Sequence, residues 1–599
     1  MTDLSRTPIA DHGVIGDLRS AALVTRGAAI DWLCWPHFDS PPLFAGLLGP
    51  SGGACVVEGD WQPAGRAYRT GTAILDTHLA AGPATITVTD FMPLTAIADP
   101  GNTGPDADAP GTLIRIVTCT AGPADVTIRI APRFDWGETQ VAAEPDGTAI
   151  CWPDCPIVAT ATHPITPDGP DARVTATLQT GETLVLILAH DAPANPATAT
   201  AALDATAAYW TGWSAACRYD RDHSELVLRS AITMKLLTHA PTGGLIAAVT
   251  TSLPEAVGYA RNWDYRYVWT RDAVFCVSAF LVLGYRREAA EFLRFIHHRD
   301  GIGGDGPLRV MYALDGDVPD EISHPALTGW RNSAPVRSGN GANDQAQHEI
   351  YGEYLAALNL YTIDHGTDGL CRELVGNLED FVRRCARAAI DRFDVPDQGI
   401  WELRGDARHL LHSKAMCWAA VDRARRIFDR LGFAPDPDWQ PRADAMLAEL
   451  RDRAWNEDAG SYVMEYGGTD LDMSTLRLAL MAVFDPASDR FARTIAAHEA
   501  ALGRGGLHDR YRFDDGLAGR EGAFVAASFW MVGAHAAAGD TTAAARKLAP
   551  VLAAASDLGL YGEEIDPDTG AHLGNFPQGL SHMALIHEVM RLYGTNPAH

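Results

Sequence analysis

The spacing of the apolar residues changes near residue 215, and this change constrains the fold more than any other feature of the chain. Before it, the runs 86–89, 126–130 and 174–178 alternate apolar with polar residues, which is typical of half-buried β-strands. Clusters of Gly, Pro and Asp separate such runs. About 200 residues of this kind, with few helix signals, predict a β-sandwich.

After about residue 220 the period becomes helical. We expect one helix to begin at Ser224, and the segments 351–358 and 586–593 place apolar or aromatic residues at positions i, i+3, i+4 and i+7. At ordinary lengths, residues 218–599 have room for about a dozen helices. The sequence therefore predicts two domains, a strand-rich one over residues 1–215 and a helical one over residues 216–599.

The net charge of the chain indicates which classes of partner are not expected. The 599 residues include 76 Asp and Glu against 48 Lys and Arg, a formal net charge of −28. Such a surplus repels phosphate backbones and anionic membrane surfaces, so neither nucleic acid nor a membrane is expected as a partner. A neutral saccharide is not repelled. The sequence contains no run of about 18 apolar residues, so we expect no membrane-spanning helix. The N-terminus lacks the pattern of a secretory signal.

The ten cysteines mostly lie in apolar surroundings, as Cys276 does, which predicts reduced core thiols in a cytoplasmic protein. Cys151 and Cys155 form a Cys-x3-Cys pair without a second ligand pair nearby. A zinc site there is the less favoured alternative, and the role of the pair stays open. No other cluster of metal ligands stands out, so neither a metal nor a cofactor is expected.

Two polar segments of the helical half are not explained by amphipathic spacing. Residues 261–272 place four aromatic residues among three Arg and two Asp. Aromatic faces stack on sugar rings while Arg and Asp bond to hydroxyls; the alternative is a buried ion-pair network under a helix start. Residues 339–353 form a polar loop that enters a helix, where Glu349 and Glu353 share a face. We expect Glu349, near Gln347, to point into a cleft and Glu353 to be solvated.

Two further segments carry acidic residues suited to acid–base chemistry. In Trp401-Glu402, apolar surroundings would disfavour a charged carboxylate and let the group hold a proton; a helix start is the alternative explanation for Glu402. Residues 562–567 contain three acids in four positions, and 574–578 follow as a shaped loop. Hydrolysis of a glycosidic bond needs one protonated and one ionised carboxyl group. Glu402 and Glu563 would supply this pair from distant parts of the chain.

Several motifs resemble glycoside hydrolase family 15, the glucoamylase-like family, in its bacterial two-domain branch that includes trehalases. The motifs recur in the family's order over nearly the whole chain: Ile-Asp-Trp-Leu-Cys-Trp-Pro at 30–36, Thr-Ser-Leu-Pro-Glu at 251–255, Arg-Asn-Trp-Asp-Tyr-Arg at 261–266 and Asn-Phe-Pro-Gln at 575–578. The resemblance implies an N-terminal β-sandwich followed by an (α/α)6 barrel catalytic domain. It also implies a pocket formed by loops at one end of the barrel.

The resemblance implies roles for particular residues. Glu402 matches the general acid and Glu563 the general base, with Glu564 as the neighbouring alternative. The residues implied in substrate binding are Trp269, Arg271, Asp272, Glu349, Trp401, Arg510, Tyr511 and Glu564.

These features together predict an inverting, exo-acting α-glucoside hydrolase. It would release glucose from trehalose or from the non-reducing end of short α-glucans, and the sequence leaves this choice and the oligomeric state open. In an inverting site the two carboxyl groups stand roughly 6.5–9.5 Å apart. A sugar phosphorylase of similar architecture and a non-catalytic carbohydrate-binding protein are the alternatives. The presence of both Glu402 and Glu563 argues against each of them.

Overall fold

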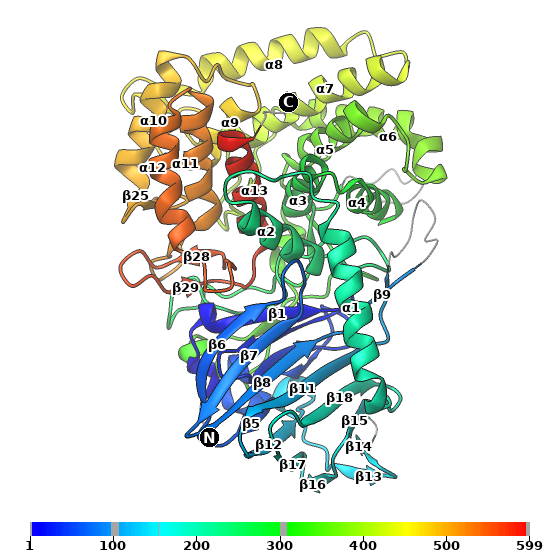
Figure 1. Cartoon of the computed structure of the whole chain (residues 1–599). Helices are drawn as coiled ribbons and strands as arrows, with labels where there is room; N and C mark the ends of the chain where they lie inside the picture. The colour runs from blue at the N-terminus through cyan, green and yellow to red at the C-terminus, as the bar shows by residue number, and fades with distance from the viewer. Residues whose placement is uncertain (1–2, 98–106, 154, 300–307, 595–599) are drawn as a thin grey trace.

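The computed structural model describes residues 3–97, 107–153, 155–299 and 308–594 (Figure 1). Strands, drawn in blue and cyan, form the lower part of the molecule, and helices form the upper part. The change of pattern near residue 215 thus separates two kinds of structure, with helix α1 ending at Ser214. The exact domain boundary stays a prediction.

The strand-rich part is built on two large antiparallel sheets. The first has the order β1-β2-β3-β5-β12-β17-β16, with β4 beside β3, and the second has the order β13-β14-β15-β18-β11-β8-β7-β6. The three alternating runs fall in β8, β12 and β17, as predicted. The bounds of the first sheet are β1 His12–Gly16, β2 Ala21–Thr25, β3 Ile30–Cys34, β4 Pro42–Phe44, β5 Ala54–Glu58, β12 Ala124–Ala131, β16 Ile165–Asp168 and β17 Asp171–Leu178. Those of the second are β6 Gln62–Tyr68, β7 Leu75–Ala81, β8 Ala84–Phe91, β11 Thr112–Ala121, β13 Glu144–Asp146, β14 Ala149–Trp152, β15 Cys155–Ala161 and β18 Thr183–His190.

Both faces of the second sheet are covered. On β11, Leu113 and Val117 join the main core, whereas Ile114 and Ile116 belong to a separate apolar cluster with residues of α1 (Ala199–Ser214). Successive side chains of a strand point to opposite faces, so the outer face carries apolar residues where α1 packs on it.

Twelve α-helices follow α1 among the described residues, and they form two concentric rings. Each inner helix contacts the next inner helix, and the last one contacts the first, which closes an (α/α)6 barrel. The inner helices are α3 Thr270–Leu283, α5 Ile350–His365, α7 Leu411–Leu431, α9 Ser474–Leu480, α11 Val525–Ala537 and α13 Gly579–Tyr593. The outer helices are α2 Ser224–Leu236, α4 Arg286–Arg299, α6 Arg372–Arg392, α8 Trp439–Arg453, α10 Asp489–Leu502 and α12 Thr541–Ala553. Helix α2 begins at Ser224, as predicted. None of the described helices combines the length and the apolar content needed to cross a bilayer.

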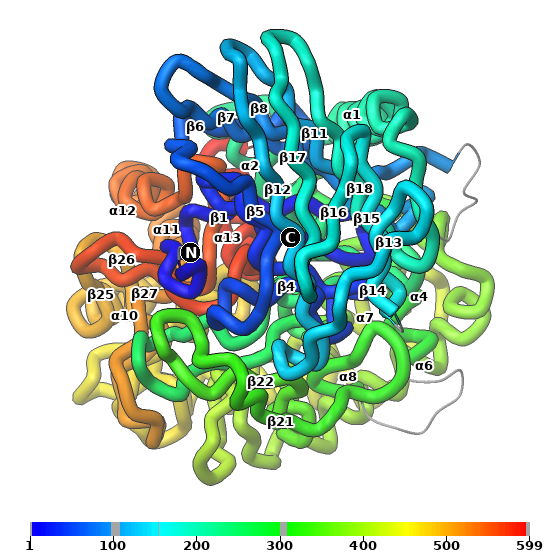
Figure 2. Tube along the Cα trace, turned by 90° about the horizontal axis from the view of Figure 1, so that it is seen from below, coloured from blue at the N-terminus to red at the C-terminus, as the bar shows by residue number. Residues whose placement is uncertain are grey.

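The sandwich supports one end of the barrel. Seen from below, the strands lie in front of the helices (Figure 2), and β28 (Glu564–Ile565) and β29 (His572–Leu573) lie between the two parts (Figure 1). The fully buried Arg266 forms a two-point ion pair with Asp264, at 2.9 and 2.7 Å, and donates a 2.7 Å hydrogen bond to the carbonyl of Ser40 in the sandwich. The sandwich therefore holds the segment 261–272 in place.

Candidate active site

A hollow of about 870 Å³ opens at the N-terminal ends of the inner helices. Its wall is made of the loops that lead into α3, α5, α7, α11 and α13, together with residues of α3, α11 and α13 themselves. Eight of the ten residues predicted for the site line it: Trp269, Arg271, Asp272, Trp401, Glu402, Arg510, Tyr511 and Glu563. Residues that are far apart in sequence thus meet at one end of the barrel.

Glu402 sits in a strained turn that leads toward α7. Its backbone φ is 57°, in the left-handed region, and its N–H donates a 3.0 Å hydrogen bond to the carbonyl of Gly399. Such strain in a non-glycine residue clusters at functional sites, where the surroundings hold it in place. The carboxylate accepts a 2.7 Å bond from the indole N–H of Trp269 and lies 3.4 Å from the guanidinium of Arg271. The expectation of apolar surroundings is therefore wrong, because an N–H donor and a cation face this group.

Glu563 is buried in the wall directly before β28. One carboxylate oxygen, Oε1, accepts a 2.7 Å hydrogen bond from the hydroxyl of Tyr265. The other, Oε2, has no hydrogen-bond partner among the described residues. Burial raises the pKa of Glu563 to about 7, although the positive charge of Arg510 and the bond from Tyr265 act in the opposite direction. A carboxyl group with this pKa exchanges its proton near neutral pH.

An aromatic pair connects the two carboxyl groups. Tyr265, which bonds to Glu563, and Trp269, which bonds to Glu402, have ring centroids 5.4 Å apart. Both side chains line the hollow. The segment 261–272 therefore positions both acids, although the sequence did not single out Tyr265 within it.

Arg271 ties the start of α3 to the loop that carries Glu402. Its Nε donates a 2.8 Å bond to Asp272, and one Nη donates a 2.8 Å bond to the carbonyl of Ile400. Arg271 and Asp272 are both largely buried. Because these contacts fix the guanidinium, Arg271 presents its remaining surface to the hollow in one orientation.

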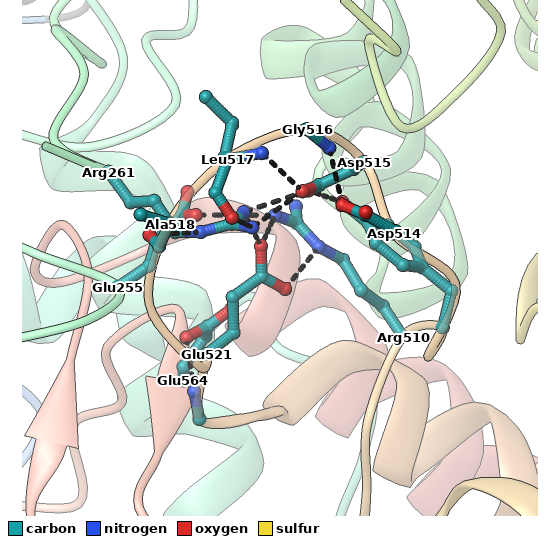
Figure 3. A network of polar contacts seen from close by, with 12 residues as sticks. Glu255, Arg261, Arg510, Asp514, Asp515, Gly516, Leu517, Ala518, Glu521 and Glu564 are labelled. Atoms are coloured by element: carbon teal, nitrogen blue, oxygen red, sulfur yellow. Dashed lines mark hydrogen bonds and ion pairs between the residues drawn. The ribbon is translucent and has the colours of Figure 1, made fainter. Parts of the chain in front are cut away.

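A network of ion pairs holds the loop that carries Arg510 and Tyr511 (Figure 3). Arg510 donates through Nε and Nη2 to Glu521, at 2.9 and 2.5 Å. Arg261 binds Asp515 through both of its terminal nitrogens, at 2.6 and 2.9 Å. The hydroxyl of Tyr511 donates a 2.9 Å bond to the same Asp515. The segment 261–272 thus contains both features considered for it, because Arg261 and Arg266 form buried ion pairs while five other members line the hollow: Trp263, Tyr265, Trp269, Arg271 and Asp272.

The same network contains three carboxylates with the spacing of a cation site. Oxygen atoms of Glu255, Glu521 and Glu564 lie within 4.8 Å of one another. Burial raises the pKa of Glu255 and of Glu564 well above the usual range of a carboxyl group. Arg510 is bonded to two of the three acids, which already places positive charge in the cluster. These acids consequently need no metal ion for charge balance.

Two of the predicted binding residues lie outside the hollow. Glu349 is fully buried and accepts a 3.3 Å bond from the hydroxyl of Ser413, so its side chain does not reach the cleft expected for it. Glu564 is also fully buried and accepts a 2.9 Å bond from the backbone N–H of Gly522. Cys151 and Cys155 are half-buried on β14 and β15, and they belong to neither group of possible metal ligands among the described residues.

Other wall residues were not predicted. Trp263 and Tyr265 belong to a segment that drew attention for its aromatic residues, and Gln578 belongs to the Asn-Phe-Pro-Gln motif, so the signal was present. Glu255 ends the Thr-Ser-Leu-Pro-Glu motif, and three more wall residues lie in the polar segment 339–353: Asn340, Ala342 and Gln345. The remaining ones were not singled out in the sequence: Ala247, Ile400, Leu403, Arg404, Asp515, Leu517, Phe524, Trp530 and Leu580.

Comparison with known families identifies the class of protein. The chain belongs to the glycosyl hydrolases family 15, whose model matches residues 221–556. A second model, described as trehalase-like, N-terminal, matches residues 2–208. The protein is therefore a glycoside hydrolase, and its substrate is a saccharide.

Relatives match over almost the whole chain. A trehalase from Mycolicibacterium smegmatis is 36% identical over 98% of this chain and 91% of its own length. A trehalase from Mycobacterium tuberculosis is 34% identical over 98% and 89%, and one from Thermoplasma volcanium 32% over 97% and 93%. The crystal structure of a bacterial glucoamylase complexed with acarbose superimposes with a TM-score of 0.69 at 12% identity, covering 98% of this chain and 94% of that one. At that identity the likeness concerns the fold, and it agrees with the sandwich and the barrel described above.

Proposed function

We propose that the protein hydrolyses trehalose to glucose with inversion at the anomeric carbon. The observation that carries the proposal is the presence of Glu402 and Glu563 in one hollow, each fixed by an aromatic hydrogen-bond donor. The choice of trehalose is supported by the three relatives named trehalase, which match both parts of the chain. Seven of the cysteines are buried, which agrees with core thiols in a reducing compartment, and we propose the cytoplasm.

In this mechanism Glu402 is the general acid and Glu563 the general base. Glu402 protonates the glycosidic oxygen as its bond to the anomeric carbon breaks. Glu563 takes a proton from a water molecule on the opposite face of the ring, and that water forms the new bond. A pKa of about 7 suits a base that works near neutral pH. A single displacement at an α-glucoside releases β-glucose from the attacked ring.

Arg271, Asp272, Arg510 and Tyr511 would bind the glucose unit that is attacked. Their hydrogen bonds within the protein fix these side chains before the substrate binds, so they lose little conformational entropy on binding. Trp263, Trp269 and Trp401 supply apolar faces for the ring and reduce the access of bulk water.

The first experiment measures glucose release from trehalose, maltose, isomaltose and maltotetraose, with NMR to identify the anomer formed first. We expect turnover of trehalose, independent of added phosphate, with one β-glucose as an initial product. Turnover of maltose without trehalose would contradict the substrate, and two α-anomers would contradict inversion.

The second experiment separates the two acids. Glu402→Gln and Glu563→Gln should each retain the fold and lose most trehalose turnover, about 100-fold or more. On α-glucosyl fluoride, whose leaving group needs little protonation, Glu402→Gln should regain activity and Glu563→Gln should not. Glu457→Gln, at an exposed position, is the matched control. If either active-site variant kept a near-normal rate on trehalose, its assigned role would be wrong.

A further inference from the structure

A second hollow, of about 1050 Å³, lies at the opposite end of the barrel axis. All six inner helices contribute to its wall, including Phe275 of α3, Glu353 of α5, Met416 of α7, Arg477 of α9, Trp530 of α11 and Glu588 of α13. Trp530 also lines the hollow that contains Glu402 and Glu563. The two hollows thus share one indole side chain as part of their walls.

Arg477 is a cation without an ion-pair partner in the described part of the chain. Its guanidinium carbon lies 3.8 Å from the ring centroid of Phe275 and 4.8 Å from that of Trp530. Its Nε is buried and has no hydrogen-bond partner among the described residues. A guanidinium that stacks on aromatic faces keeps its N–H groups in plane, where they can bind an oxyanion.

Glu353 also lines this hollow with unused hydrogen-bonding capacity. The residue is 0% exposed, and among the described residues neither of its carboxylate oxygens has a hydrogen-bond partner. The expectation that Glu353 is solvated is therefore wrong. Burial raises its pKa to about 8, against the influence of Arg271 and Arg477. Near neutral pH the group is mainly a carboxylic acid, which can donate its O–H to an oxyanion.

The other cations of this wall are already paired. Arg423 and Arg426 contact Asp422, at 2.6 and 2.8 Å, and Arg591 contacts Glu588 at 2.9 Å. Arg477 differs from these arginines because it has no ion-pair partner among the described residues. The remaining wall is largely apolar and includes Leu360, Ile363, Leu480 and Met481, of which Ile363 is 43% exposed.

We propose that this hollow binds a small organic anion with an apolar body, its oxyanion held by Arg477 and Glu353 and its body packed along Leu360, Ile363 and Leu480. The site is separate from the hydrolytic one and takes a ligand of a different chemical class. Arg477 lies in the last turn of α9, where the helix dipole favours a cation. That dipole effect accounts for a charge at this position but predicts no ligand, so a binding experiment distinguishes the two explanations.

The experiment uses 8-anilino-1-naphthalenesulfonate, a fluorescent organic anion, with the full-length folded protein at pH 7. We expect saturable binding of one equivalent, and displacement by octanoate at concentrations where 1-octanol has little effect. Arg477→Met should weaken binding about tenfold or more, since it removes a charge-assisted bond. Arg426→Met, the same change at an arginine already paired with Asp422, should weaken it less than twofold.

A second variant keeps the test decisive if Arg477→Met fails to fold. Ala356 lines this hollow and not the hydrolytic one, so Ala356→Trp should fill the space and abolish binding without removing a polar group. Glu353→Gln keeps a neutral hydrogen-bond donor and should retain binding within about threefold. Equal binding by the unmodified protein and Ala356→Trp would overturn the proposal. Equal displacement by octanoate and octanol would do so as well, because it would remove the role of the anion.

Discussion

Gly574 leaves no space for a side chain next to the proposed base. A Cβ at this position would lie 2.5 Å from Oε2 and 2.7 Å from Cβ of Glu563. Ordinary non-bonded contacts start at about 3.5 Å, so Gly574→Ala would push the carboxyl group away by roughly 1 Å. Since a misplacement of about 1 Å costs on the order of 100-fold in rate, we expect kcat to fall by about that factor.

Gly570, in the same hairpin, provides the matched control. Its φ of +74° is close to the +69° of Gly574, but no atom lies within 4 Å of the Cβ it would gain. Both Ala variants therefore carry a similar backbone cost of about 1–2 kcal/mol, and only one of them displaces Glu563. Gly570→Ala should keep kcat within twofold of the unmodified protein.

The assay is steady-state glucose release from trehalose, with thermal unfolding to compare the stability of the two variants. Similar Tm values together with a large difference in kcat would locate the defect at Glu563. If Gly574→Ala kept kcat within threefold of Gly570→Ala, the position of the carboxyl group would not govern the rate, and the assignment of Glu563 as base would lose its geometric support.

Three further predictions concern the same pair of acids. Tyr265→Phe removes the hydrogen bond that lowers the pKa of Glu563, so the acidic limb of the pH profile of kcat/KM should move above about 7, and a profile with an unmoved limb would contradict this. Because the fold raises the pKa of Glu563 from 4.5 to about 7, the protein loses stability as the pH rises through that window, on the order of 3 kcal/mol. The Tm of Glu563→Gln minus the Tm of the unmodified protein should therefore be larger at pH 8 than at pH 5. The same Tm difference at the two pH values would refute the argument that burial raises the pKa of Glu563. Trp269→Phe removes the N–H donor to Glu402 and should lower kcat about tenfold, measured against Trp455→Phe, a half-buried position that does not line the hollow.

Local sequence patterns predicted much of the fold because each strand or helix has its own period. The runs in β8, β12 and β17 and the start of α2 at Ser224 were visible in this way. The closure of six helices into a ring depends on contacts between segments that are far apart. Here the resemblance to a family, and not the period, supplied the prediction.

The two wrong predictions, apolar surroundings for Glu402 and solvent exposure for Glu353, have physical causes. Trp401 and Glu402 are neighbours in the chain, but the indole of Trp401 donates to Asp472 while Glu402 meets Trp269 from another loop. Adjacency in sequence therefore gave the wrong environment for Glu402. Glu353 was assigned to solvent because a polar residue usually marks the exposed face of a helix. The inner helix α5 is enclosed almost all round, so its polar residue faces the axis of the barrel instead.

The contact between Arg266 and Ser40 makes the N-terminal sandwich a structural partner in catalysis. Arg266 anchors the stretch of chain from which Tyr265 and Trp269 reach the two acids, and one of its bonds ends on a carbonyl some 230 positions earlier in the polypeptide. Removing the first 200 residues would leave a guanidinium with an orphaned donor under the catalytic loop, even though all six inner helices would still be encoded. We therefore expect the barrel without the sandwich to lose the alignment of its catalytic loop, so that transferring the barrel alone into another protein would not transfer the activity.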